Sequence, residues 1–180
     1  MRLKTSGLVV AHESAADMPR TTTEGITAPT IEAKWQMTES AGPTVALLLS
    51  TALPIGSPAL RPGELQPAAL LSAELPVGGE ASVSLNAGVV SAFDVDLEDR
   101  FAQGFFAGVL SFALADNWGG FVEAAVATGD DTHGDATVFI DGGLSWVVNP
   151  DLQLDVSAIR GVTVAATDWT AMVGVSLRFR

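Results

Sequence analysis

The chain has 180 residues, which suits one domain, and carries a formal net charge of −12 with a pI near 4.3. This acidity argues against nucleic-acid binding, which needs basic patches, and the absence of cysteine excludes disulfides, thiol catalysis and zinc–thiolate sites. Hydrophobic residues make up 48% but charged residues only 17%, and no apolar run approaches the roughly 18 residues that a spanning helix needs. A membrane protein of this composition would therefore cross the bilayer as a barrel.

The start of the chain carries only a weak export-signal pattern. The apolar run from Leu8 to Ala11 is short, and His12 and Glu13 follow it at once. The favoured interpretation is a mature form, or a fragment whose export signal is missing.

Runs of alternating apolar residues predict about ten strands and no helix. In chain order they lie at roughly 2–10, 26–37, 43–52, 65–75, 79–90, 101–114, 118–127, 135–147, 151–160 and 168–179. Short turn-forming connections alternate with longer polar ones, and the longer ones lie at roughly 11–25, 53–64, 91–100, 128–134 and 161–167. This alternation is typical of outer-membrane barrels, which have tight periplasmic turns and long outer loops.

The strands have two different faces. From Trp169 to Phe179 every second residue is apolar, and the strands at 79–90, 118–127 and 151–160 alternate in the same way. Their polar faces carry mostly Ser, Thr, Gly, Gln and Asn with one or two charges per strand, whereas the solvent face of a sandwich is usually rich in Lys and Glu. The pattern therefore favours a barrel with a crowded polar interior over a soluble sandwich.

Four tryptophans lie on the apolar parity near strand ends, as an interfacial girdle requires. These predicted membrane-interface aromatics are Trp35, Trp118, Trp146 and Trp169. A sandwich core with Trp at its ends is the alternative, and the complete lack of Tyr counts against a barrel girdle.

The fold class predicted is all-β: one antiparallel up-and-down transmembrane β-barrel of about ten strands over residues 1–180, with 1–25 weakly defined. A twelve-strand barrel that lacks its N-terminal part is the variant kept open.

Three segments carry a family resemblance. Residues 108–123, 140–146 and 149–155 resemble successive hairpin elements of the bacterial transporter-like family labelled "putative MetA-pathway of phenol degradation". The stretch from Ala46 to Leu53 also fits, and the resemblance covers roughly 26–180. The resemblance implies a porin-like barrel of the Gram-negative outer membrane with a transport-like role. Members of the family are often encoded near functions of aromatic degradation. The chain departs from the family in a shorter N-terminal part and in ending on Arg180 rather than on an aromatic residue.

The polar faces supply a set of candidate lumen-lining residues, namely Glu32, Lys34, Glu74, Glu80, Glu123, Asp141, Asp155 and Arg178. We expect Glu123, Asp141 and Asp155 on adjacent walls, with Arg178 and Lys34 as neutralising partners if the first strand closes against the last, because unpaired carboxylates in a narrow interior are unfavourable. Such a group fits either a polar constriction that selects small solutes or a salt-bridged plug that fills a small barrel.

The acidic loops at 94–99 and 129–135 lack EF-hand spacing and are interpreted as solvated loops rather than calcium sites. His12 and His133 both fall in predicted loops, and no nucleophile motif frames a serine such as Ser91. We expect no catalytic residues, no metal site and no cofactor.

The sequence predicts an outer-membrane barrel that acts as a passive channel or transport-related protein for small solutes. Their aromatic or hydrophobic character is implied only by the family label. Two alternatives stay open: a filled structural barrel of the envelope, and a soluble lipocalin-like or sandwich carrier. The expected partners are outer-membrane lipid, the barrel-assembly machinery during biogenesis and a small-molecule solute of unknown identity.

Overall fold

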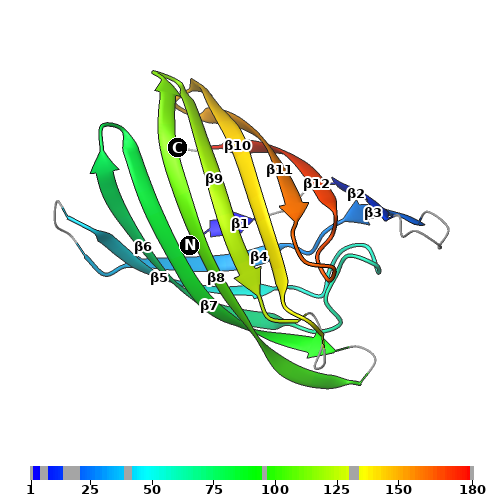
Figure 1. The fold of residues 1–180 in the computed structure, drawn as a ribbon. Helices are drawn as coiled ribbons and strands as arrows, with labels where there is room; N and C mark the ends of the chain where they lie inside the picture. The colour runs from blue at the N-terminus through cyan, green and yellow to red at the C-terminus, as the bar shows by residue number, and fades with distance from the viewer. Residues whose placement is uncertain are drawn as a thin grey trace.

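The computed structural model describes residues 2–4, 8–13, 21–38, 42–94, 97–129 and 134–178, which form one large curved sheet and one separate hairpin (Figure 1). The sheet contains β1 (Arg2–Lys4), β4 (Thr30–Gln36), β5 (Thr44–Ala52), β6 (Gln66–Gly78), β7 (Ala81–Asp94), β8 (Asp99–Ala115), β9 (Trp118–Ala127), β10 (Thr137–Asn149), β11 (Leu152–Gly161) and β12 (Trp169–Leu177). The hairpin contains β2 (Leu8–Glu13) and β3 (Thr21–Ile26). None of the described residues belongs to a helix long and apolar enough to cross a bilayer.

The large sheet is an antiparallel meander. Each strand from β4 to β12 pairs with the next strand along the chain, and β1 adds to β4 over three positions, from Arg2↔Glu32 to Lys4↔Thr30. The predicted all-β up-and-down architecture is thereby confirmed. The sheet is not closed, because β1 and β12 stand at opposite ends of the strand order. The expected seam between the first and last strands is absent from the described residues.

The N-terminal expectation was wrong. Instead of one strand over 2–10 and a loop over 11–25, the chain forms β1 and then pairs β2 with β3, from Leu8↔Ile26 to Glu13↔Thr21. The run Thr21–Thr23 is polar but β-branched, and threonine fits a pleated strand well. His12 consequently lies in a strand rather than in a loop.

The β7–β8 hairpin is longer than predicted. Its strands continue through much of the expected 91–100 loop and pair as far as Asp94↔Asp99. Asp94 is only 8% exposed, and its side-chain Oδ1 accepts a 3.1 Å hydrogen bond from the backbone N–H of Leu97. This carboxylate closes the turn, which explains why an acidic run that looks solvated belongs to a hairpin end.

The two sides of the sheet differ in exposure as the alternation predicts. On β9, Val122, Ala124 and Val126 are exposed, whereas Glu123 is less exposed and Ala125 is buried. The less exposed face is called the inward face below, because it is the face expected on the concave side of a curved sheet.

Within the described residues, no second layer covers the apolar face. The accessible surface of the 18.6 kDa chain is 12084 Å², whereas a soluble monomer of this mass would expose roughly 8,200 Å². The described hydrophobic core consists of four alanines, Ala46, Ala92, Ala107 and Ala125, and no described side chain of large volume is fully buried. The fold therefore lacks the sheet-on-sheet core of a soluble sandwich.

Candidate functional site

Two carboxylates face each other on the inward wall. Glu123 on β9 and Asp141 on β10 are direct cross-strand partners, and both are less exposed than their outward neighbours Val122 and Ile140. Directly opposed residues of an antiparallel pair have Cβ atoms about 4.5–5.5 Å apart. The two acidic side chains therefore share one small region of the wall.

This carboxylate pair has apolar neighbours on both sides. Val109 of β8 lies opposite Glu123, and Ile159 of β11 lies opposite Asp141. Two like charges between aliphatic side chains are stabilised by cations, by water or by hydrogen-bond donors brought by a solute. The arrangement can therefore attract cations and repel anions.

The expected larger cluster does not form. Asp155 pairs with Ser145 and Gly174, and it lies two inward positions nearer the short turns than Asp141, whose partner on β11 is Ile159. Arg178 lies just beyond β12, where its backbone N–H donates a 2.9 Å hydrogen bond to the carbonyl of Asp151. The expectation of one acidic wall with Arg178 beside it is therefore wrong in its register, because strand pairing puts Asp155 and Arg178 at different heights from Asp141.

The remaining predicted lumen residues are spread over the first strands. Glu32 lies opposite Ser50, Lys34 opposite Leu48, and Glu74 opposite both Thr44 and Ser84. Lys34 is therefore separated from Glu123 by four strands of the sheet order. Its predicted role as a neutralising partner depended on closure of the sheet.

Glu80 does not lie in a strand wall. β6 runs on to Gly78, so the turn falls at Gly79 and Glu80 rather than at the predicted residues 76–78. Gly79 has a φ of 58°, a left-handed conformation that glycine adopts without steric cost. The turn chemistry was recognised in the sequence, but its position was about two residues early.

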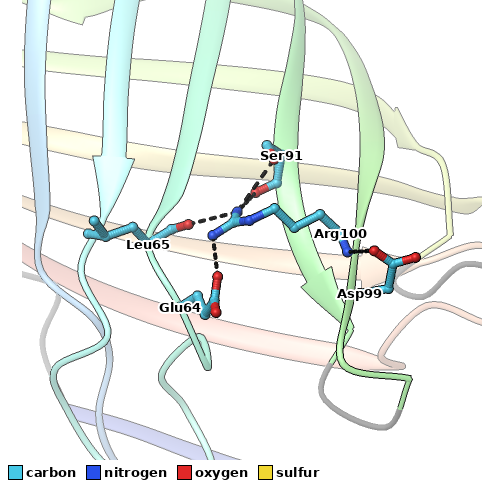
Figure 2. Close-up of polar contacts among 5 residues, drawn as sticks. All are labelled: Glu64, Leu65, Ser91, Asp99 and Arg100. Atoms are coloured by element: carbon cyan, nitrogen blue, oxygen red, sulfur yellow. Dashed lines mark hydrogen bonds and ion pairs between the residues drawn. The ribbon is translucent and has the colours of Figure 1, made fainter.

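The sequence prediction missed the contacts of Arg100, which connect two strands to a long connection (Figure 2). Its Nη2 forms an ion pair with Glu64, and its Nη1 donates hydrogen bonds to the carbonyls of Leu65 (3.0 Å) and Ser91 (3.4 Å). Its backbone N–H donates to Asp99 Oδ1 at 2.7 Å. The β5–β6 connection is thereby fixed to the β7–β8 hairpin. The only signal for this in the sequence is one cation at the end of an acidic run.

Among the described residues, no group of three or more His, Cys, Asp or Glu is placed to hold a metal ion. Residues 130–133 of the second acidic loop, including His133, lie outside the described residues. A pairing of Ser91 with His133 therefore falls partly outside the described residues, and Ser91 itself lies beside Arg100.

Comparison with known proteins now identifies the family. The family described as "Putative MetA-pathway of phenol degradation" matches residues 1–179. The chain belongs to this family. The resemblance predicted from residues 108–123 and the neighbouring hairpins is confirmed, and the match also includes the N-terminal residues.

One solved structure shows the same fold as this MetA-pathway family member. It is a structure of the NanC porin in a rhombohedral crystal form, with a TM-score of 0.66 and 11% sequence identity, covering 94% of this chain and 91% of the porin chain. At such low identity the likeness shows a porin-like fold alone. No curated protein matches the sequence.

The tryptophans of the MetA-pathway chain lie at strand ends on the outward face. Trp118 and Trp146 stack on each other, Trp169 lies under the guanidinium of Arg160 at 5.1 Å from the ring centroid, and Trp35 is 66% exposed. Their role at a membrane interface stays a prediction.

Proposed function

We propose that the protein is an outer-membrane β-barrel that provides a passive path for small solutes. The single observation that carries the proposal is the large exposed apolar face of an otherwise regular antiparallel meander. Leu85, Val122 and Val156 on that face are all exposed at mid-strand, and no described element covers them. Lipid is the solvent in which such a face is stable. Membership of the MetA-pathway family and the porin-like fold support the same proposal.

The outward face also carries a hollow that suits lipid contact. It has a volume of about 320 Å³ between β7, β8 and β9, where Gly108 and Ala124 are flanked by Val83, Leu110 and Val122, and where Val109 and Glu123 also contribute to the lining. Small residues among larger aliphatic ones leave an apolar depression that a lipid chain can fill. Outer-membrane lipid and the barrel-assembly machinery are the partners that this proposal implies.

The inward face is the proposed path. It carries the carboxylate pair of Glu123 and Asp141, with Glu74 on the same cross-strand row and Asp155 at another height. Rings or walls of acidic side chains favour cations and neutral molecules over anions. We therefore propose a path for small neutral or cationic solutes, and the family description supports aromatic compounds among them.

Conductance and selectivity test this function. The purified protein, reconstituted in a planar bilayer with a KCl gradient, is expected to give discrete current steps. Their reversal potential should be shifted from zero towards the equilibrium potential of potassium. The double variant Glu123→Gln/Asp141→Asn should move that potential towards zero. Asp168→Asn is the matched control, because it removes an exposed acidic charge from the β11–β12 connection, and it should leave the reversal potential unchanged. A silent bilayer would contradict the proposal.

A filled, non-conducting barrel is the second candidate, because bulky side chains also share the inward face. Phe105, Phe121 and Phe139 lie there opposite small residues of the neighbouring strands. Three rings would narrow a small barrel considerably. This candidate expects outer-membrane partition and heat-modifiable migration on a detergent gel without any current. A soluble carrier would show neither membrane partition nor heat-modifiable migration.

A further inference from the structure

A second hollow lies away from the inward wall, between the β3–β4 connection and the β5–β6 connection. Its volume is about 510 Å³, within the range of small-molecule pockets. It is lined by Ile26, Thr27, Pro29, Ile55, Gly56, Ser57 and Pro58. We call it the loop pocket.

The loop pocket is built by specific backbone contacts. The N–H of Ile26 donates a 3.0 Å hydrogen bond to Ser57 Oγ, and the N–H of Ser57 donates a 2.9 Å bond back to the carbonyl of Ile26. The N–H of Leu53 donates to the carbonyl of Pro29 at 3.0 Å. These bonds hold the two connections together, so the pocket exists without a ligand.

Gly56 allows the close approach of the two connections. Its φ is 130°, and a Cβ at this position would lie 2.7 Å from the carbonyl oxygen of Ile26. Any larger residue would force the β5–β6 connection away from β3. At its other end the same connection is fixed by Arg100 through Glu64 and Leu65. The wall of the pocket is therefore anchored on both sides.

The walls are uncharged and mostly apolar. Ile26 and Ile55 are 59% and 58% exposed, two prolines add further apolar surface, and no lining residue is ionisable. Ligand pockets are lined predominantly by apolar side chains. Such walls favour neutral molecules, because a charged solute would lose hydration without a compensating partner.

One polar atom in this wall has no partner within the described part of the chain. The hydroxyl oxygen of Thr27 is buried there and makes no hydrogen bond. Buried polar atoms in proteins are normally paired. This oxygen has almost no accessible surface, so the hydroxyl of a bound molecule would supply the missing partner only once the atoms that cover the oxygen are displaced.

We propose that the loop pocket binds a small, mostly apolar molecule that carries one hydroxyl group. The pocket lies on the side of the long connections, where Leu65 and Val164 also expose aliphatic side chains. Binding there would concentrate the solute beside the entrance of the barrel. This second step rests on the proposed channel function, whereas binding itself does not.

The test uses the full chain in amphipol and 4-fluorophenol as the probe, with binding followed by ¹⁹F line broadening. The wild-type protein is expected to bind the probe saturably. Ile55→Asp should weaken binding at least tenfold, because it puts a charge into the apolar wall. Leu97→Asp is the matched control, since Leu97 is similarly exposed at 55% but lies in the β7–β8 turn outside the pocket, and it should bind as the wild type does.

A second variant tests the hydroxyl partner. Thr27→Val keeps the shape of the side chain but removes its oxygen, so 4-fluorophenol should bind more weakly while fluorobenzene binds as before. Absence of saturable binding to the wild type, or equal loss in the Ile55→Asp and Leu97→Asp variants, would overturn the inference. Conductance without binding contradicts the loop pocket alone, whereas binding without conductance contradicts the channel alone.

Discussion

Trp118 and Trp146 lie directly opposite each other on β9 and β10, and their indole rings stack with centroids 5.6 Å apart and planes 4° from parallel. Stacked aromatic pairs contribute about 0.5–1.5 kcal/mol beyond their buried area. A double-mutant cycle with Trp118→Ala and Trp146→Ala, measured by urea unfolding in lipid vesicles, should give a coupling energy of that size. The pair Trp35 and Trp118, on β4 and β9, is the control and should be additive. Additivity in both pairs would remove the stack as a source of stability.

Val122 tests the lipid-facing assignment of the outward face. It lies in the middle of β9 and is 50% exposed. A bilayer around it predicts that Val122→Arg lowers the free energy of unfolding by ~2–4 kcal/mol. Val164→Arg, at a fully exposed position in the β11–β12 connection, should change it little. Equal and small effects of the two substitutions in vesicles would mean that Val122 does not face lipid.

Gly143 makes room for an aromatic ring on the inward face. A Cβ at Gly143 would lie 2.5 Å from Phe121 Cε1 and 2.7 Å from the carbonyl oxygen of Val156. Gly143→Ala should therefore lower the free energy of unfolding by about 1–3 kcal/mol through overpacking. Gly104→Ala is the matched control, because its nearest neighbour would be Thr128 Cγ2 at 3.5 Å. If both alanine variants unfold at the same urea concentration, a Cβ at Gly143 does not overpack against its neighbours.

Glu123→Gln removes one charge of the carboxylate pair and keeps the side-chain shape. Like charges directly opposite on neighbouring strands are destabilising, so the variant should unfold at higher urea concentration, with a gain of about 0.2–1 kcal/mol. Asp155→Asn, whose partners Ser145 and Gly174 carry no charge, should give no comparable gain. If Asp155→Asn raises the free energy of unfolding and Glu123→Gln does not, the repulsion does not lie between Glu123 and Asp141.

Arg100→Met should release the β5–β6 connection without unfolding the sheet. The ion pair with Glu64 is exposed, and exposed ion pairs contribute about 0–1 kcal/mol. The expected result is faster cleavage after Glu64 by a glutamate-specific protease, with little change in the unfolding midpoint. Arg160→Met, which removes the analogous contact with Asp168, should leave cleavage after Glu64 unchanged. Unchanged cleavage in Arg100→Met would show that the connection is held by other contacts.

Much of the sheet could be predicted because its strands obey a period of two. The run from Trp118 to Ala127 and the turn at Asp116 and Asn117 carry their structure locally, through alternation and turn chemistry. The segment Thr21–Ile26 was missed because three threonines are polar by composition but suited to strands by shape.

The candidate site was predictable only as far as register could be counted. Glu123 and Asp141 were correctly expected on adjacent strands, but the height of Asp155 depends on the turn at Pro150 and Asp151. The role assigned to Arg178 assumed a closed barrel, which is a long-range property that no local pattern encodes. The partners of Arg100 were missed for the same reason, since the path of the β5–β6 connection has no periodicity.

The nearest-neighbour order of the sheet has a consequence for how the chain is assembled. From β4 to β12 each strand pairs with its neighbours along the chain. Such a topology has low contact order, and each hairpin can form before the next one is available. It is also modular: a hairpin could be lost or duplicated without changing the alignment of the others. The number of strands in such a barrel is therefore free to vary while the pairing within each hairpin stays the same.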